Sequence, residues 1–420
     1  MSAAIPSLLD ELRWRELLHQ HTEGAAEALA RGAVRGYVGF DPSAASLHVG
    51  NLVPVMGLAH LQRAGHTPVI LVGGGTGMIG DPSGKTAERQ LLDADQVRAN
   101  AAALRTQLQH FLDFSGSNAA LVRDNADWLL TLGAVEFMRD VGKHFSVNVM
   151  LAKESVKSRL ESGISYTEFS YMLLQAYDFL ELHRREGVTF QMGGSDQWGN
   201  ITAGTELVRR ADGAEAHGIT LPLVTTATGV KFGKSEAGAV WLDPAMTSPY
   251  RFYQFWVNTD DRDSARYLRM FTTRSREEIG VLEAAGEKEA SRREAQHALA
   301  EDVTRRVHGD DAARVARELS ALLFGGGDPA TLSSVALEAL AREVPFAEVE
   351  SADVLDLLVA TNLAASKGAA RRLLEQGGVY VNGVRAESAV REVSSDRRLA
   401  GGHVLLRKGA REYALVRMRT

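Results

Sequence analysis

Cysteine is absent from the 420 residues of this chain. Disulfide bonds, thiolate zinc sites and a cysteine nucleophile are therefore excluded, and the composition is compatible with a reducing compartment. The sequence also lacks a run of about 18 apolar residues, which a membrane-spanning helix needs. Its first residues include Asp10, Glu11 and Glu16 in place of a basic leader. We therefore expect a cytoplasmic protein that has no membrane contact.

Several short catalytic signatures are missing as well. No G-x-S-x-G turn and no His-Glu-x-x-His pair occurs, so the sequence gives no support to a serine hydrolase or a zinc hydrolase. The balance of 45% hydrophobic and 24% charged residues is that of a folded soluble protein, which excludes a disordered or fibrous chain. At this length we expect about three folded units at most.

Charge is distributed unevenly along the chain, although the total is only −6. Residues 353–420 contain 12 Lys and Arg against 7 Asp and Glu, a net charge of +5. The remaining residues hold 35 basic and 46 acidic groups, a net charge of −11. The basic tail would attract a polyanion such as RNA. Charge alone leaves a second interpretation open, because arginine-rich helices are also common as solvated surfaces.

The order of the expected elements indicates the fold class. Residues 36–40 and 68–72 have the pattern of buried strands, and a helical pattern over 50–63 lies between them. Helical patterns then dominate from 93 to about 182, and a short strand is expected over 188–191. This alternation predicts an α/β fold with a Rossmann-like, doubly wound parallel sheet that binds ligands at its strand ends.

Glycine and proline mark the expected domain boundaries. We expect a Rossmann-like catalytic domain over 1–225, with a helical insertion at about 125–185, and a lysine-bearing loop with a helical domain over 226–325. A glycine run then begins a linker over 326–352. Two short helices within 355–374 and strands at 379–381 and 403–406 predict a small α+β domain over 353–420.

Two glycine-rich patterns resemble phosphate loops only weakly. Residues 75–80 match G-x-G-x-x-G, but Pro82 and Gly84 stand where its helix should continue. Residues 80–86 resemble a Walker loop that has one residue too few and lacks its first glycine. These patterns therefore give little support to a nicotinamide-dependent enzyme or a P-loop protein.

A turn after the first expected strand gives a stronger signal. The strand ends at Phe40, an Asp-Pro turn reverses the chain, and a helix begins near Gly50. His48 and Asn51 thereby lie at a helix N-terminus, where side-chain donors and the helix dipole both favour phosphate. Gly50 has no side chain, so a flat purine could pack against the backbone there. His48 by itself would equally suit an ordinary capped helix.

Residues 231–235 form a second candidate phosphate-binding segment. Lys231 and Lys234 lie three positions apart between Gly229 and Gly238, so two ammonium groups occupy a flexible loop. Mobile lysines can close on a phosphate whose charge grows in a transition state. Alone, a K-x-x-K-S segment is also common as a solvated turn. Its pairing with the His48 turn is what points to a nucleotide site.

The two segments resemble the ATP motifs of the class I aminoacyl-tRNA synthetases, as His48-Val49-Gly50-Asn51 and Lys231-Phe232-Gly233-Lys234-Ser235. Within that family the chain resembles the bacterial tyrosyl-tRNA synthetases, with further similarity over 73–85, 141–145, 193–200 and 248–250. The resemblance covers nearly the whole chain. It implies an ATP-dependent ligase that converts L-tyrosine to tyrosyl-adenylate, releases pyrophosphate, and transfers tyrosine to the 3′ end of tRNA(Tyr).

The resemblance implies particular site residues. Those assigned to L-tyrosine are Tyr37, Asp81, Tyr171, Gln175, Asp178 and Gln197. Those assigned to ATP are Gly39, Asp41, Ser43, His48, Gly50, Asn51, Lys85, Arg89, Asp196, Lys231 and Lys234. Those assigned to catalysis are His48, Asn51, Lys231, Lys234 and Ser235. Helical spacing places Tyr171, Gln175 and Asp178 on one face, which would suit an exposed polar stripe as well as a site.

The implied chemistry has no covalent enzyme intermediate, because the tyrosine carboxylate attacks the α-phosphorus of ATP directly. The protein orients the reactants and stabilises charge. Mg²⁺ would accompany ATP without a protein metal cage, and no permanently bound cofactor is expected. Asn51 stands where the family has a second histidine, so a hydrogen-bond donor remains but no group that titrates near neutral pH. Phe232 and Gly233 replace the Met and Ser of many synthetases.

The basic tail resembles an S-four-type RNA-binding domain. The residues that it would use are Lys367, Arg371 and Arg372 on a helix, and Arg407, Lys408 and Arg411 near a hairpin turn. Phosphate contacts would supply most of the affinity for tRNA. The resemblance also implies a homodimer with its contact within residues 128–160. Two alternatives stay open: a tryptophanyl-tRNA synthetase, against which Asp178 facing a phenol argues, and an RNA-binding relative that has lost catalysis.

Overall fold

The computed structural model of this protein describes residues 7–83, 92–157, 163–235, 238–387 and 392–419. Lys85 and Arg89, expected at the ATP site, lie outside these residues. The chain divides into two compact units, one formed by Met1–Thr247 with Val257–Val307 and the other by Ser248–Trp256 with His308–Thr420. Among the described residues, no helix combines the length and apolar character needed to cross a membrane.

The first unit is built on a six-stranded sheet with the order β1-β6-β5-β2-β3-β4. Its strands are β1 (Gln20–His21), β2 (Arg35–Phe40), β3 (Thr67–Val72), β4 (Leu121–Asp124), β5 (Phe190–Gly194) and β6 (His217–Leu221). Neighbouring strands are parallel except for β1 and β6. The chain extends the sheet in one direction from β2 and later in the other, so the strand order reverses between β2 and β5. In doubly wound sheets, ligands bind at the carboxyl ends of the strands at this point.

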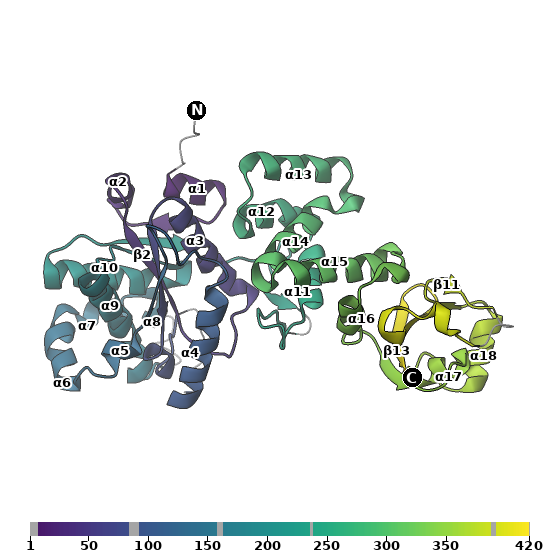
Figure 1. Ribbon diagram of the computed structural model, residues 1–420. Helices are drawn as coiled ribbons and strands as arrows, with labels where there is room; N and C mark the ends of the chain where they lie inside the picture. The colour runs from purple at the N-terminus through teal and green to yellow at the C-terminus, as the bar shows by residue number, and fades with distance from the viewer. Residues whose placement is uncertain (1–6, 84–91, 158–162, 236–237, 388–391, 420) are drawn as a thin grey trace. The chain divides into compact units, whose positions relative to one another are not determined.

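Helices cover both faces of this sheet. On one face α3 (Leu52–Arg63) packs against β2, β3 and β5, and on the other lie α9 (Tyr166–Glu186) and α10 (Trp198–Asp212) (Figure 1). The Ser165 side chain caps α9 by accepting a hydrogen bond from the Glu168 amide, and Gly187 ends the helix in a left-handed conformation. Buried Tyr37 from β2 and Phe179 from α9 belong to one core cluster. The expected doubly wound α/β fold is thus confirmed.

The stretch from 93 to about 182, expected to be mainly helical, contains a strand that the sequence pattern did not predict. We expected helices to dominate from 93 to about 182, and α4 (Ala94–Leu108) begins that stretch. The structure adds β4 at the edge of the sheet. This strand has four half-buried residues, two apolar and two charged, and so short a segment produces no clear alternation. At residues 75–80 the chain forms only the short turn η2 (Thr76–Met78), not the opening of a long helix.

Three helices complete the first unit beside α1 (Leu8–Trp14). They are α12 (Asp261–Phe271), α13 (Arg276–Lys288) and α14 (Glu294–His308). In the sequence, a small antiparallel pair of β7 (Lys234–Ser235) and β8 (Gly238–Ala239) lies between the last strand of the sheet and these helices. The expected helical domain over 226–325 is therefore divided, because α11 (Pro249–Val257) and α15 (Asp310–Gly325) belong almost entirely to the second unit.

The second unit contains a five-stranded sheet with the order β11-β10-β12-β13-β9. Its elements are α16 (Ser334–Leu340), β9 (Phe346–Val349), α17 (Val354–Ala360), α18 (Lys367–Glu375), β10 (Val379–Val381), β11 (Val384–Arg385), β12 (His403–Lys408) and β13 (Glu412–Met418). The expected linker over 326–352 is structured, because β9 pairs with β13 and Leu337 and Leu340 of α16 share a core with Leu405 and Leu415 of the sheet.

Candidate active site

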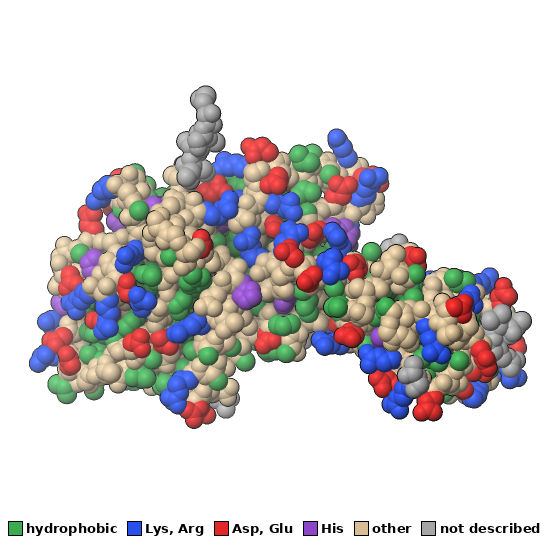
Figure 2. Space-filling view, viewed as in Figure 1, with side chains coloured by type: hydrophobic (Ala, Val, Ile, Leu, Met, Phe, Trp, Pro, Cys, Tyr) green, Lys and Arg blue, Asp and Glu red, His purple; other side chains and the backbone are tan. Residues whose placement is uncertain are grey.

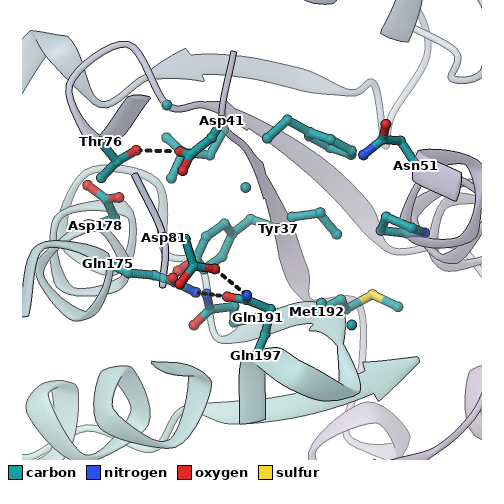
Figure 3. Close-up of a pocket in the computed structure, with 18 of the residues that line it drawn as sticks. Tyr37, Asp41, Asn51, Thr76, Asp81, Gln175, Asp178, Gln191, Met192 and Gln197 are labelled. Carbon is teal, nitrogen blue, oxygen red and sulfur yellow. Dashed lines mark hydrogen bonds between the residues drawn. The ribbon is translucent and has the colours of Figure 1, made fainter. Parts of the chain in front are cut away.

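A cavity of about 290 Å³ lies at the carboxyl ends of β2 and β5, where the strand order reverses (Figure 3). The predicted site residues among its lining are Tyr37, Gly39, Asp41, Ser43, His48, Asn51, Asp81, Tyr171, Gln175, Asp178 and Gln197. They come from segments that are far apart in sequence. The sheet brings β2 and β5 side by side, since Tyr37 of β2 lies opposite Gln191 of β5 in the strand register.

The polar face of α9 points into the protein. Tyr171 is 6% exposed and Asp178 is 2% exposed, and Gln175 lines the cavity between them. The spacing alone also allowed these residues to form a solvent-exposed polar stripe, and that interpretation is therefore wrong. Because an α-helix presents residues four and seven positions apart on one side, a single rigid helix supplies three polar groups to the cavity.

Tyr37 and Asp178 form a buried polar pair in the cavity wall. The Tyr37 hydroxyl is fully buried and has no hydrogen-bond partner among the described residues. The two carboxyl oxygens of Asp178 accept hydrogen bonds from Trp128 Nε1 at 2.8 Å and Asn125 Nδ2 at 2.9 Å. Burial raises the pKa of Asp178 to about 8, although these two hydrogen bonds favour its ionised form. A ligand hydroxyl could bond to both groups, and would give the Tyr37 hydroxyl its missing partner.

A second polar group is a chain of carboxyl and amide side chains. Gln197 donates to Asp81 Oδ2 at 2.5 Å, and Gln175 donates to Gln197 Oε1 at 3.1 Å (Figure 3). The Tyr171 hydroxyl donates to Asp41 Oδ2 at 2.8 Å, and burial followed by the nearby Asp41 charge raises the pKa of Tyr171. The carboxyl groups of Asp41 and Asp81 give this part of the cavity acceptors and negative charge, which suit a ligand ammonium group.

The turn before α3 is held by its own polar side chains. His48 Nδ1 accepts a hydrogen bond from the Gly50 amide, and the His48 amide donates to Asn51 Oδ1, both at 3.0 Å. Since Nδ1 accepts, neutral His48 carries its proton on Nε2. The Asn51 amide nitrogen points toward the cavity in Figure 3. The asparagine that replaces the family's second histidine therefore both fixes the turn and offers a donor to a ligand.

The structure brings the two phosphate-type segments together. The Val49 amide donates to the Val240 carbonyl at 2.9 Å, and the Leu242 amide donates to the Leu47 carbonyl at 2.8 Å. His48 and Trp241 form a β-bridge, with their rings edge to face at 6.0 Å. The chain that follows the lysine-bearing segment is thus paired along the His48 turn, which lines the cavity.

Some predicted residues are not among the cavity lining. They are Gly50, Asp196 and Lys231, together with Lys234 and Ser235, whose backbones form β7 and whose side chains lie outside the description. Asp196 lies in the turn directly after β5, beside Gly194, which does line the cavity. Among the described lining residues, His48 is the only basic side chain. Positive charge for a phosphate must therefore come from outside this set.

Sequence reasoning missed four polar residues of the site. Thr76 Oγ1 donates to Asp41 Oδ1 at 2.7 Å, and Asn125 Nδ2 donates to Thr76 Oγ1 at 2.9 Å as well as to Asp178. With Trp128, these side chains link Asp41 to Asp178, and the fourth, Gln191, lines the cavity from β5. Asn125 directly follows β4, so recognition of that strand would have placed Asn125 at the ligand-binding edge of the sheet.

One glycine in this network is required by close packing. A Cβ at Gly73 would lie 2.2 Å from Asp41 Oδ1 and 2.5 Å from Thr76 Oγ1. Any side chain there would displace the carboxyl group that Tyr171 and Thr76 hold. No group of three His, Asp or Glu side chains with the arrangement of metal ligands occurs in the part of the chain that the structure describes.

The predicted RNA-binding residues of the second unit do not form a single cluster. Arg371 and Arg372 are exposed on α18, and Lys367 at its start pairs with Asp356. In β12, Arg407 lies over the Tyr380 ring, with its guanidinium carbon 3.9 Å from the ring centre. Alternation along the strand places Arg407 on the sheet face of Leu405, toward α16. Lys408 takes the opposite face, shared with α17 and α18, and pairs with Glu412 at 2.9 Å, while exposed Arg411 lies in the hairpin turn.

Known proteins match the chain over both units. A family model described as tRNA synthetases class I (W and Y) matches residues 29–325, and one described as Tyrosine--tRNA ligase SYY-like C-terminal domain matches residues 336–416. A tyrosine--tRNA ligase of Anaeromyxobacter dehalogenans is 58% identical over 418 residues, 98% of this chain and 100% of the relative. One from Bacillus caldotenax is 51% identical over 98% of this chain and 99% of its own length.

A solved structure supports the same assignment. The C-terminally truncated mitochondrial tyrosyl-tRNA synthetase of Coccidioides posadasii is 34% identical, with a TM-score of 0.66 over 75% of this chain and 92% of that protein. The strand order, the cavity at its reversal point and the pairing of the two phosphate-type segments agree with these matches. This chain belongs to the class I tRNA synthetases, in the group of the tryptophan and tyrosine enzymes.

Proposed function

We propose that this protein is a tyrosine--tRNA ligase, which activates L-tyrosine with ATP to tyrosyl-adenylate and pyrophosphate and then transfers tyrosine to the 3′ end of tRNA(Tyr). The observation that carries the proposal is the buried pair of Tyr37 and Asp178 in the cavity at the β2–β5 reversal. A phenol can donate to the Asp178 carboxyl group and accept from the Tyr37 hydroxyl. A tryptophan side chain has a single N–H donor and no acceptor, so it could not accept a hydrogen bond from the Tyr37 hydroxyl while it donates to Asp178.

The remaining cavity groups suit the other end of an amino acid. Asp81, Tyr171 and Gln175 would hold the α-ammonium, and Gln197 would lie on the carboxylate side. The hydrogen bonds from Gln197 to Asp81 and from Gln175 to Gln197 fix these groups before a ligand arrives. Such preorganisation lowers the entropy cost of placing the carboxylate for attack on the α-phosphorus.

ATP would occupy the side of the cavity formed by the His48 turn and the lysine-bearing segment. Asp196 would bind the ribose, Ser43 would contact the phosphates, and Gly39, Asp41 and Gly50 are further candidate contacts to ATP. Of these five residues, Gly39, Asp41 and Ser43 line the cavity. His48 Nε2 and the Asn51 amide would donate to the phosphates, and Lys85, Arg89, Lys231, Lys234 and Ser235 would add charge and donors. Mg²⁺ would enter with ATP as part of the substrate. We place this reaction in the cytoplasm.

An exchange assay tests the function directly. The purified protein, supplied with ATP, Mg²⁺ and labelled pyrophosphate, should exchange label into ATP when tyrosine is present and far more slowly with phenylalanine or tryptophan. Addition of total tRNA should then give tyrosyl-tRNA. Exchange that depends on tryptophan would support the tryptophanyl alternative. Binding of tRNA without any exchange would support an RNA-binding relative that has lost catalysis.

The exposed arginines of α18 should contribute to tRNA binding. Replacement of Arg371 and Arg372 by alanine should weaken tRNA binding and lower the slope of log K against log salt by about one for each lost phosphate contact. Tyrosine-dependent pyrophosphate exchange needs no tRNA and should keep its rate. Filter binding at several salt concentrations measures the slope. Arg314→Ala is the matched control, since Arg314 is exposed and ion-paired on α15. An unchanged slope in the double variant would remove α18 from the RNA contact.

We propose further that the protein is a homodimer. Large hydrophobic side chains are exposed between α5 (Ala126–Leu129) and the end of α7 (Val147–Leu151). They are Leu130, Val135, Met138, Val147, Val149 and Leu151, and Figure 2 shows hydrophobic atoms at the surface near α5 and α6. A patch of this kind on a folded protein marks an interaction surface. A second copy of the chain would bury it.

Val135→Asp should disrupt this dimer. Val135 is 79% exposed, so an aspartate there leaves the fold of the single chain intact but places a charge in the contact. Light scattering after size exclusion should give the mass of two chains for the wild type and of one chain for the variant. Val281→Asp is the control, because Val281 is 69% exposed on α13 and outside the patch. A wild type with the mass of one chain would refute the proposal.

A further inference from the structure

One face of α12 contacts the segment that carries the two signature lysines. Asp263, Tyr267 and Phe271 follow one another at intervals of four residues, so they share a side of the helix. They are 5%, 2% and 1% exposed. Phe232, which lies between the lysines, has its ring centre 5.0 Å from that of Tyr267, edge to face, and 5.0 Å from that of Phe271, stacked. The Asp263 carboxylate accepts a hydrogen bond from the Ala227 amide at 2.7 Å.

α12 is itself fixed to the part of the first unit that carries the His48 turn. The buried guanidinium of Arg15, which directly follows α1, donates to the carbonyl oxygen of Arg269 in the last turn of α12 and to those of Thr272 and Arg274 after it, at 2.8–2.9 Å. The bond to Arg269 satisfies one of the carbonyl groups that a helix end leaves without a partner. α12 also packs against α3, which begins directly after Asn51 (Figure 1). The helix is therefore a rigid support, not a loosely attached element.

The opposite side of the segment meets the His48 turn. Gly233 has a φ of +86°, and a Cβ there would lie 3.0 Å from Val49 Cγ2 and 3.2 Å from the Gly50 amide nitrogen. The Gly233 carbonyl accepts from the Val240 amide at 3.2 Å, and Val240 in turn pairs with Val49. The Phe232 ring thus packs on α12, whereas Gly233 and the carbonyl oxygen of Phe232 lie against the His48 turn.

We propose that the Asp263, Tyr267 and Phe271 face of α12 is a positioning platform for the lysine-bearing segment. It holds Phe232, and through it the backbone of Lys231 and Lys234, at a fixed distance from the His48 turn. The platform residues touch no substrate, so they are positioning residues. The inference rests on the proposed function, in which both lysines act on the phosphates of ATP. Catalytic rates are sensitive to such placement, since a shift of about 1 Å can cost about 100-fold.

Substitutions at the anchor should change the rate and spare tyrosine binding. Phe232→Ala should lower kcat for tyrosine-dependent pyrophosphate exchange by about 10- to 100-fold. The KM for tyrosine should stay the same, because no platform residue lines the tyrosine cavity. Asp263→Ala should also lower kcat, whereas Asp263→Asn should restore it, because the asparagine oxygen still accepts from the Ala227 amide. Phe111→Ala is the control for lost core packing, since Phe111 is 7% exposed, close to the 5% of Phe232, and belongs to neither segment.

A double variant separates positioning from general damage. In a Lys234→Ala background, Phe232→Ala should lower kcat less than it does in the wild type, because one of the groups that Phe232 positions is already gone. The fold-reduction in kcat should be smaller by a factor of about three or more. An equal factor in both backgrounds, or a kcat unchanged by Phe232→Ala, would overturn the inference. So would an Asp263→Asn variant as impaired as Asp263→Ala. If the wild type itself shows no tyrosine-dependent exchange, the proposed function fails before the platform is reached.

Discussion

Replacement of Lys234 by alanine will lower the rate of tyrosyl-adenylate formation by about 10²- to 10³-fold, which is the typical cost of removing one preorganised donor to a developing charge. When pyrophosphate leaves, negative charge on the β- and γ-phosphates grows, and an ammonium group on the hairpin beside the His48 turn would stabilise it. Tyrosine-dependent pyrophosphate exchange measures the rate. The affinity for tyrosine should be unchanged, since the tyrosine cavity contains no part of β7.

The control for this variant is Lys288→Ala. Lys288 is exposed at the end of α13, and its removal should leave both the exchange rate and the thermal unfolding midpoint unchanged. Lys234→Ala should likewise unfold at the wild-type temperature, because alanine keeps the backbone of β7 and adds neither bulk nor charge. A wild-type exchange rate in Lys234→Ala would exclude Lys234 from the mechanism.

Replacement of Asp178 by asparagine will reduce the preference for tyrosine over phenylalanine by about 10- to 100-fold. Both Asp178 oxygens already accept hydrogen bonds from Asn125 and Trp128, so an amide NH₂ group must face either one of these donors or the phenol. An unsatisfied buried polar group costs about 1–3 kcal/mol, and each 1.4 kcal/mol is about tenfold. The ratio of kcat/KM values for the two amino acids in pyrophosphate exchange measures the effect.

Tyr37→Phe provides a second test of the same pocket. It deletes a buried hydroxyl that has no partner in the described structure, so the variant should be at least as stable as the wild type. Its preference for tyrosine should nevertheless fall by about 2- to 10-fold, the value of one lost neutral hydrogen bond of about 0.5–1.5 kcal/mol. Wild-type selectivity in both variants would show that the phenol does not bind between Tyr37 and Asp178.

The sequence predicted the strands β2 and β3 and the helix α3 because each has a strong local signal. In the sequence, each of the two buried strands is a short apolar run next to glycine, and α3 follows a turn whose residues can cap a helix. The edge strand β4 and strand β9 escaped prediction for the opposite reason. Each has four residues, and in each the pattern of burial depends on a neighbouring strand that lies far away in sequence.

The residues of the site likewise divide into those that the sequence predicted and those that it did not. The resemblance to the synthetase motifs supplied the residues of the His48 turn and the inward face of α9, whereas Thr76, Asn125, Trp128 and Gln191 were missed. The resemblance assigned no site role to those four residues, which gain their roles from contacts with distant segments of the chain. Thr76 even lies within a glycine pattern that suggests a phosphate loop, and the structure uses its hydroxyl to connect Asp41 to Asn125.

The amino-acid sequence by itself determined the class of fold, the two segments that resemble synthetase motifs and the basic character of the tail, because these depend on local patterns and composition. Tertiary structure alone decided that the polar face of α9 is buried, that residues 240–242 pair with the His48 turn, and that Arg407 and Lys408 point to opposite faces of their sheet. The physical reason is that burial, strand pairing and the direction of a side chain belong to pairs of distant segments. No single segment of the chain carries that information.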